Sequence, residues 1–283
     1  MTVLVTGARG NIGARVVSAL AASGHRVRAS ARSAETLAVP PGVEAVELNA
    51  AAPRNAAAVL KDVRAVFLYA AATLEGDIRG FLEEARAAGV EHLVLLSSPA
   101  SYEAGEHDRL IGRAHRAAEE AVEEAGPPST LLYPAWLAGN AQRDWAGQIK
   151  ERGRVALPYP DAQVNPVHLD DVAEVAADLL TRDRHRARFQ VVTGPEPMRL
   201  RDVVEAVGDA VGTPIPIDVP SRDEAMARRE AWMPAEVLDA LLDVEAAAVG
   251  VPAPVTNTVE RVTGHPARPF AEWARTHRKD FSA

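Results

Sequence analysis

A run of regularly spaced glycines near the start of the chain limits its possible folds more than any other feature. The run reads Thr6-Gly7-Ala8-Arg9-Gly10-Asn11-Ile12-Gly13. The apolar stretch 3–5 precedes it, and apolar residues then recur at helical spacing from Ile12 to Leu20, with Gly24 where a helix would stop. A strand, a glycine turn and a helix in this order are typical of a pyrophosphate site, in which amides at the helix N-terminus bind the anion. The sequence therefore predicts a dinucleotide site formed by Gly7, Ala8, Arg9, Gly10, Asn11 and Ile12, the alternative being a tight turn that binds nothing.

Short β-rich runs alternate with helical patterns through the first half, as in a parallel sheet built from βαβ units. Six strands are predicted there, over residues 3–5, 27–30, 43–48, 65–68, 92–96 and 130–132. Helices are predicted over 75–88 and 114–125, each followed by a glycine. The fold class is therefore α/β: a Rossmann-type doubly wound parallel sheet in residues 1–135, and a smaller C-terminal substrate lobe in 136–283, from which about 155–195 return to the sheet.

The second half has longer loops and more proline. A helix is expected from Asp170-Asp171 through Leu180, with one of these two aspartates as its N-cap. Further elements are predicted as a strand over 189–192, helices over 200–211 and 235–247, and an amphipathic helix over 270–281. A second lobe packed on the first is expected from this pattern.

Composition narrows the choice of partners. The net charge of −8 argues against a protein that binds nucleic acid, and no stretch approaches the roughly 18 apolar residues of a membrane span. There is no cysteine, and the eight histidines never approach metal-ligand spacing, so no metal is expected. We expect a cytoplasmic monomer or homodimer whose partner is a small-molecule substrate.

The end of the second predicted strand indicates which dinucleotide binds. An acidic residue at this position would select NAD(H) by bonding to the ribose 2′-hydroxyl, but no carboxylate occurs here before Glu35. Arg32, together with Arg9 from the glycine turn, could instead bind a 2′-phosphate through charge-assisted hydrogen bonds. NADP(H) is therefore predicted in preference to NAD(H), the alternative being that both arginines are merely solvated.

Several motifs together resemble the NmrA-like family of atypical short-chain dehydrogenases/reductases, whose members include NAD(P)H-dependent quinone and isoflavone reductases and redox sensors without turnover. They are the glycine turn, Arg32, the stretch 115–120 ahead of 130–134, and the segment 167–173. The resemblance covers roughly residues 1–195. It implies that strand tips meet the nicotinamide end of the cofactor, through Tyr69, Ala70, Ala71, Ser97, Tyr133 and Pro134. His115 could take the place of the family's lysine, touching the ribose or relaying a proton.

The usual proton donor of short-chain reductases, a tyrosine followed four residues later by lysine, does not occur. The four tyrosines are followed at that spacing by Thr73, Glu106, Leu137 and Gln163. Candidate catalytic residues are instead Ser98, Tyr102 and His115. Each has a simpler reading: turn hydrogen bonds for the serine, packing for the tyrosine, and a surface position beside Glu119 for the histidine.

A substrate pocket is expected at the mouth of the sheet, lined by Pro99, Trp136 and Trp145, with Leu137 and Trp232 as further candidates. Taken together, these features predict an NADP(H)-dependent oxidoreductase that passes hydride to a small quinone, carbonyl compound or other planar organic substrate. Two alternatives stay open: an NAD(P)-binding redox sensor or regulator without turnover, and a repurposed non-redox isomerase or cyclase.

Overall fold

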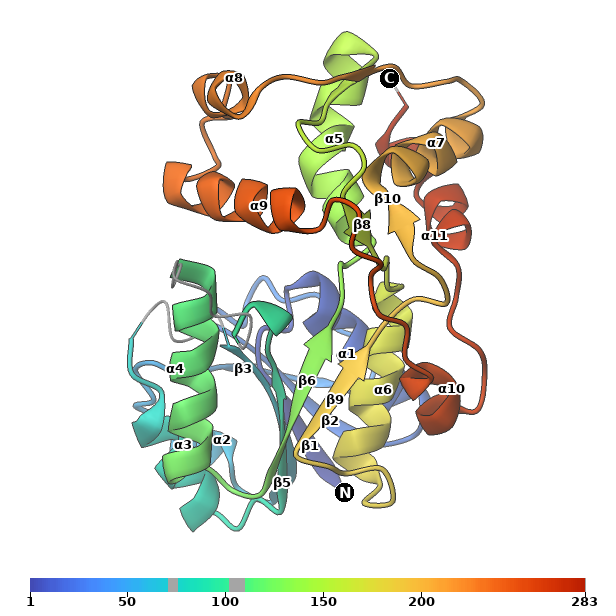
Figure 1. Cartoon of the computed structure of the whole chain (residues 1–283). Coiled ribbons are helices and arrows are strands. Elements are labelled where there is room, and N and C mark those ends of the chain that lie inside the picture. The colour runs from blue at the N-terminus through green and yellow to red at the C-terminus, as the bar shows by residue number, and fades with distance from the viewer. Residues whose placement is uncertain (71–75, 102–109, 283) are drawn as a thin grey trace.

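The structure is a computed structural model that describes residues 1–70, 76–101 and 110–282. Seven parallel strands form its central sheet in the order β3-β2-β1-β4-β5-β6-β9, seen in the lower half of Figure 1. The strand order reverses between β1 and β4, which is where ligands of open α/β sheets bind. The strands are β1 (Thr2–Val5), β2 (Arg26–Ala31), β3 (Glu44–Glu47), β4 (Val63–Tyr69), β5 (His92–Leu96), β6 (Ser129–Pro134) and β9 (Phe189–Val192). The predicted Rossmann-type fold is confirmed.

Both faces of the sheet are buried, because its strands are apolar at successive positions. In β1, Val3 and Val5 belong to one hydrophobic cluster, whereas Leu4 between them belongs to the other. All five residues of β5 are buried. Such continuous apolar runs are expected only where helices cover the sheet on both sides.

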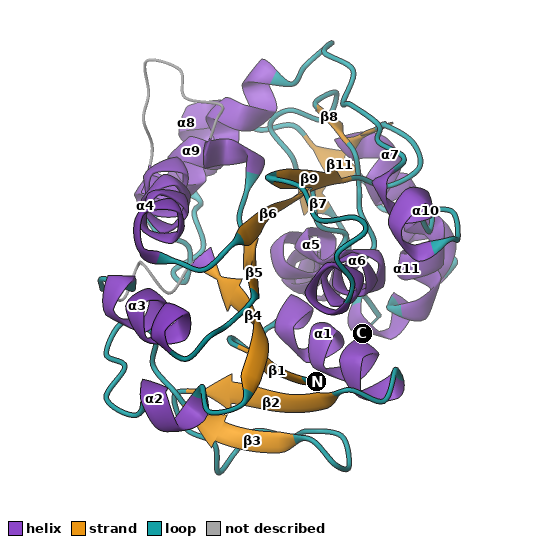
Figure 2. Cartoon of the chain, turned by 90° about the horizontal axis from the view of Figure 1, so that it is seen from below, coloured by secondary structure: helices purple, strands orange, loops and turns teal. Residues whose placement is uncertain are grey.

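Two layers of helices provide this cover, as Figure 2 shows from below. On one face lie α1 (Asn11–Ala22) and α6 (Leu169–Thr181), which pack against each other. On the other face lie α2 (Ala56–Val59), α3 (Arg79–Ala87) and α4 (Leu110–Ala125). Helix α1 ends where the sequence predicts: Gly24 has φ of 77°, its N–H donates to Ala21 O at 3.0 Å, and His25 N–H donates to Leu20 O at 3.1 Å.

The upper lobe in Figure 1 is built mainly from the second half of the chain, while β9 and α6 of that half belong to the sheet layers. Two short strand pairs lie in this lobe, one parallel (β7 with β11) and one antiparallel (β8 with β10). The remaining elements are η2 (Pro99–Ser101), α5 (Gly139–Arg152), β7 (Val155–Ala156), β8 (Gln163–Val164), β10 (Met198–Arg199), α7 (Leu200–Val211), β11 (Ile217–Asp218), α8 (Arg222–Ala227), α9 (Ala235–Ala247), α10 (Thr258–Thr263), α11 (Phe270–Thr276) and η3 (Arg278–Asp280).

Two local predictions need correction, and one further helix was missed. The N-cap of α6 is His168, whose Nδ1 accepts from Asp170 N–H at 3.1 Å, so neither predicted aspartate caps the helix; both lie in its first turn. Helix α5 was not predicted. The amphipathic segment 270–281 is broken into α11 and η3. Over the described residues, no helix has the length and apolarity needed to cross a membrane.

Candidate active site at the carboxyl ends of the strands

The glycine turn between β1 and α1 is closed so tightly that side chains would not fit. A Cβ added at Gly13 would lie 2.2 Å from the carbonyl oxygen of Gly7, and one at Gly10 would lie 3.2 Å from the same atom. Gly7 itself has φ of 63°, a left-handed conformation that favours glycine. The three glycines therefore let the first turn of α1 pack directly onto the end of β1.

The N-terminus of α1 is suited to an anion. Its N-cap, Gly10, makes no side-chain cap, and no acidic residue lies in the first turn of this 12-residue helix. The first amides of the helix are thus left without a side-chain acceptor, and the positive end of the helix dipole is not neutralised. A pyrophosphate fits this cradle.

Arg9 joins the glycine turn to the loop after β2. Its Nη2 donates to the backbone carbonyl of Ser33 at 2.9 Å and also contacts the hydroxyl of Thr36. Arg32 follows β2 directly and is exposed. Both predicted arginines thus belong to the same edge of the site, where the chain carries no carboxylate before Glu35.

Tyr69, at the end of β4, stands beside the glycine turn. A Cβ on Gly7 would lie 3.6 Å from Tyr69 Cβ, and Tyr69 N–H donates to Thr6 Oγ1 at 3.2 Å. Burial raises the pKa of Tyr69, against a smaller lowering by the charge of Arg143, although 45% of the residue is exposed. The Tyr69 side chain thus lies beside the glycine turn and is open to solvent. Ala70 is buried beside it, and the predicted Ala71 lies outside the described residues.

A polar triplet follows β5. The Ser97 hydroxyl donates to Glu119 Oε1 and lies 3.3 Å from Nδ1 of His115. Since the single hydroxyl hydrogen of Ser97 points to Glu119, its contact with His115 requires the histidine Nδ1 to carry a hydrogen, which leaves Nε2 as the acceptor. Burial lowers the pKa of His115, so the ring is neutral at neutral pH.

The other predicted catalytic residues differ in what surrounds them. Ser98 is half-buried, and its hydroxyl accepts from Ala100 N–H at 3.3 Å, a turn contact. Pro99 begins η2 and is half-buried. Tyr102 lies outside the described residues.

The aromatic residues in and after β6 lie on both sides of the sheet and differ in burial. Tyr133 is 5% exposed and its ring lies 6.3 Å from that of Phe189, on the far side of the sheet from Trp136. Trp136 is half-buried, 5.9 Å from the ring of Trp145 and 6.4 Å from that of Phe270. Trp145, only 4% exposed, supports Trp136 from within the core, whereas Trp232 is 56% exposed and lies apart from this core cluster.

Two charged residues of α5, Arg143 and Asp144, were not among the candidates named from the sequence. Nε and Nη2 of Arg143 donate to the carboxylate of Asp144 at 2.6 and 2.7 Å. Burial alone would lower the pKa of Arg143, but the hydrogen bonds to Asp144, the charge of Asp144 and that of Tyr69 together raise it. The positive charge of Arg143 reaches Tyr69, and the negative charge of Asp144 reaches Glu245 on α9. Charged residues of α5 thus act on the end of β4 and on α9.

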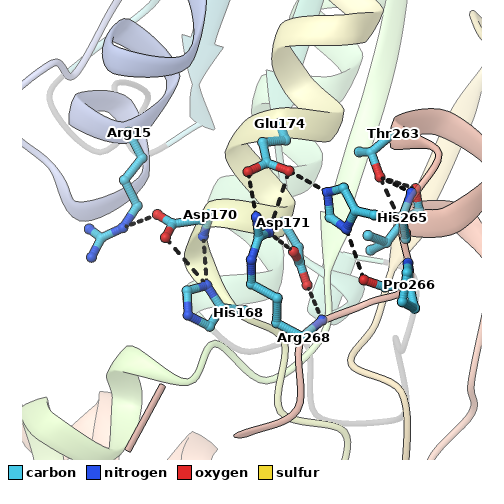
Figure 3. A network of polar contacts seen from close by, with 10 residues as sticks. Arg15, His168, Asp170, Asp171, Glu174, Thr263, His265, Pro266 and Arg268 are labelled. Carbon is cyan, nitrogen blue, oxygen red and sulfur yellow. Dashed lines mark hydrogen bonds and ion pairs between the residues drawn. The ribbon is translucent and has the colours of Figure 1, made fainter. Parts of the chain in front are cut away.

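A separate network ties α6 to the C-terminal segment (Figure 3). Asp171, fully buried, accepts from the backbone N–H of Arg268 at 2.8 Å and from its guanidinium, which also donates to Glu174 at 2.8 Å. Glu174 in turn contacts His265 Nε2 at 2.6 Å. A metal-ligand atom is offered by each of Asp171, Glu174 and His265, all within 4.8 Å of one another. However, the guanidinium of Arg268 already forms ion pairs with both carboxylates. The network is an ion-pair clamp between segments, and Asp170 adds a further pair with Arg15 of α1 at 2.8 Å.

Comparison with known proteins agrees with this geometry. A family model described as NAD(P)H-binding matches residues 7–183. The chain is 38% identical over 283 residues to a (4-alkanoyl-5-oxo-2,5-dihydrofuran-3-yl)methyl phosphate reductase of Streptomyces griseus, with 99% of each chain covered. It is 30% identical to an NAD(P)H azoreductase of Xenophilus azovorans, again with 99% of each covered. The solved structure of an NADPH-dependent quinone oxidoreductase from Escherichia coli, complexed with NADPH, has a TM-score of 0.82 at 20% identity and covers 98% of this chain and 99% of its own; at that identity the likeness concerns the fold.

Proposed function

This chain belongs to the NAD(P)H-binding, NmrA-like family of atypical short-chain dehydrogenases/reductases and is an oxidoreductase, and on that premise we propose that it is an NADP(H)-dependent reductase of small, planar, electron-poor substrates. The acceptor is a quinone, a carbonyl compound or another conjugated molecule. It binds between the strand tips and the C-terminal lobe, which acts as the substrate lobe.

The position of Arg9 carries the proposed preference for NADP(H). Its guanidinium extends from the glycine turn to the loop after β2, beside Arg32. Two guanidinium groups at this edge suit a 2′-phosphate, since arginine binds phosphate in a planar, two-point geometry. The ribose of NAD(H), which lacks that phosphate, would have no carboxylate here to accept a hydrogen bond from its 2′-hydroxyl.

Different residues of the site would contact different parts of the cofactor. The amides of Gly7, Asn11 and Ile12 would hold the pyrophosphate, since those of Ala8 and Gly10 already donate to Ser30 O and Gly7 O. Residues Tyr69, Ala70, Ala71, Ser97, His115, Tyr133 and Pro134 would flank the nicotinamide end. When bound, the reduced dinucleotide supplies hydride. The chain's own task is to orient the acceptor and to exclude water, with Pro99 and Trp136 at the mouth and Trp145 behind them.

The relatives support an acceptor that takes hydride readily. The substrate named for the Streptomyces griseus enzyme contains a ring double bond conjugated to two carbonyl groups, and an azo bond, as in the substrate class named for the other, is also an electron-poor π system. Such acceptors need little activation, which suits a chain without the tyrosine and lysine pair.

The proposal is tested by binding and then turnover. NADPH and NADH are each titrated by nucleotide fluorescence, and NADPH consumption is then followed with a (4-alkanoyl-5-oxo-2,5-dihydrofuran-3-yl)methyl phosphate, menadione, an aryl azo dye and an aryl ketone. We expect tighter binding of NADPH and consumption with at least one acceptor. Binding without consumption across this panel would contradict a reductase and favour the redox sensor.

A further inference from the structure

The polar triplet after β5 lies at the carboxyl edge of the sheet. Ser97 directly follows β5, and its N–H donates to Leu132 O of β6 at 2.9 Å, which continues the strand ladder by one residue. Leu96, the residue before it, is the register partner of Tyr69 in β4, and Tyr69 stands beside the glycine turn. Ser97 therefore lies one strand beyond the strand tip that adjoins the glycine turn.

The start of α4 packs closely against the loop after β5. A Cβ added at Gly112 would lie 2.7 Å from the carbonyl oxygen of Ala100, so only glycine lets the helix approach this closely. One turn further along, Nη1 of Arg116 donates to the carbonyl oxygen of Ser101 at 2.6 Å. His115 lies between these two contacts, so the packing of the backbone fixes where its ring stands.

Ser97 connects the other two members of the triplet. The residue is 4% exposed, so water does not compete for its hydroxyl group. The single hydroxyl hydrogen is donated to Oε1 of Glu119, because a carboxylate only accepts. Nδ1 of His115, 3.3 Å from the same hydroxyl oxygen, must then carry the hydrogen of that contact. In the described part of the chain no ion pair joins His115 to Glu119 directly, so the serine is the link between them.

This arrangement leaves Nε2 of His115 with a bare lone pair. Burial lowers the pKa of His115, so the ring is neutral at neutral pH. Over residues 1–70, 76–101 and 110–282, Nε2 has no hydrogen-bond partner, yet the atom is not closed off from solvent. Nε2 is thus an acceptor that a hydroxyl group can reach. A lysine would donate to the same group, so the histidine reverses the direction of the hydrogen bond.

We propose that Glu119 is a positioning residue for cofactor binding, an inference that rests on the proposed function. By accepting the hydroxyl hydrogen of Ser97, Glu119 fixes the Nδ1–H tautomer of His115, and the bare Nε2 accepts a hydrogen bond from a hydroxyl group of the nicotinamide ribose. Glu119 itself touches neither the cofactor nor the acceptor. Without it, the Ser97 hydroxyl would donate to Nδ1, and the ring would carry its hydrogen at Nε2, as in the form that predominates in free histidine.

The tautomer is measured by ¹⁵N NMR of protein labelled in the histidine rings, since bare and hydrogen-bearing nitrogens resonate at well-separated frequencies. His115 is assigned among the eight histidines by the signals lost in His115→Gln. The wild type without nucleotide is expected to show Nδ1–H and a bare Nε2. Glu119→Met keeps the length of the side chain but offers no strong acceptor, so it should move the hydrogen to Nε2. Glu119→Gln keeps an acceptor oxygen and should retain Nδ1–H, and Glu120→Met at the exposed neighbouring position is the matched control.

Addition of NADPH gives a second readout. A hydrogen bond to a bare ring nitrogen moves its resonance to lower frequency, so the Nε2 signal of wild-type His115 is expected to shift in this direction when the nucleotide binds. The Kd for NADPH is expected to rise by about 3- to 10-fold in Glu119→Met, as for the loss of one hydrogen bond, and to stay within about twofold of the wild type in Glu119→Gln. Should Glu119→Met fail to fold, the wild-type tautomer and its response to NADPH still decide.

Three results would overturn the inference and leave the reductase in place. They are an Nε2–H ring in the wild type, an Nδ1–H ring or an unchanged Kd in Glu119→Met, and a wild-type Nε2 signal that does not respond to bound NADPH. Absence of NADPH binding by the wild type would instead overturn the proposed function, and the tautomer of the protein without nucleotide would still report on the role of Glu119.

Discussion

The guanidinium of Arg9, which leaves the glycine turn, donates to the backbone carbonyl of Ser33 beyond β2 at 2.9 Å. In the proposed complex, this contact would hold a positive charge near the 2′ substituent of the dinucleotide ribose. Because Arg32 follows β2 directly, the proposal assigns both cations to one 2′-phosphate.

Replacement of Arg32 by alanine is expected to weaken NADPH binding by about 10- to 100-fold, the loss of one or two charge-assisted hydrogen bonds. NADH binding should change by less than about twofold, since NADH lacks the phosphate. Fluorescence titration of both nucleotides measures the difference. Arg64→Ala, an exposed arginine near the amino end of β4 that pairs with Glu91, is the control and should alter neither. Equal losses for the two nucleotides would count against the assignment.

Gly13→Ala is expected to abolish nucleotide binding and to destabilise the fold. Its Cβ would meet the carbonyl oxygen of Gly7 at 2.2 Å, so the turn must open and the amides lose their arrangement. Gly147→Ala in α5 is the matched control, because nothing lies within 4 Å of an added Cβ there. In a helix interior that change should stabilise by up to about 1 kcal/mol. Thermal melting and nucleotide titration of both variants provide the comparison, and a Gly13→Ala protein that still binds NADPH normally would contradict the close packing of the turn.

Arg268→Ala is expected to lower the free energy of unfolding by on the order of 3 kcal/mol, because the fully buried carboxylate of Asp171 loses its guanidinium partner and keeps only the hydrogen bond from the backbone N–H of residue 268. Adding Asp171→Asn to this variant should restore part of the loss. The control is Arg201→Ala, which removes an exposed pair with Asp161 and should cost less than about 1 kcal/mol. Urea unfolding measures all three. A similar loss for both arginines would show that the clamp of Figure 3 acts like a surface pair.

Glu245 also makes stability depend on pH. Its pKa is raised from 4.5 to about 7 in the folded protein, so between these values the folded state binds more protons than the unfolded state. Its contribution therefore lowers the free energy of unfolding as pH rises through this window. His92 acts in the opposite direction, since burial lowers its pKa from 6.5 to about 4.

For this reason the measurement is the difference between wild type and Glu245→Gln across pH 4.5 to 7. The variant should become more stable relative to wild type as pH rises. Two parallel stability curves would show that the carboxyl group titrates normally in the folded state.

The parts of the site that depend on local sequence were predictable. The glycine turn, β1 and the end of α1 near Gly24 follow from neighbouring residues. Each of these glycines is required by close contacts or by a positive φ within its own segment. The bounds of α7, α9 and β9 agree with prediction for a similar reason: each has a clear hydrophobic period bounded by polar or turn residues.

The parts that depend on tertiary packing were not predictable. Helix α5 buries only Ala141, Trp145 and Ile149 among many polar residues, so its pattern is weak and the pair Arg143 and Asp144 went unnoticed. Ser97, His115 and Glu119 meet only because α4 packs beside β5; their sole sequence signal is the spacing of four between histidine and glutamate. Nothing in the sequence near Glu245 indicates its altered acidity, because the cause is its burial and a charge on α5.

Transfer of deuterium from NADPH labelled at C4 of the nicotinamide tests the central claim most directly. The wild-type protein is mixed with one C4-deuterated epimer of NADPH at a time and with a (4-alkanoyl-5-oxo-2,5-dihydrofuran-3-yl)methyl phosphate. The mass of the product is then measured by mass spectrometry. We predict that one epimer alone passes a single deuterium to carbon in the product. Unlabelled product from both epimers, or NADPH left unconsumed, would contradict the account.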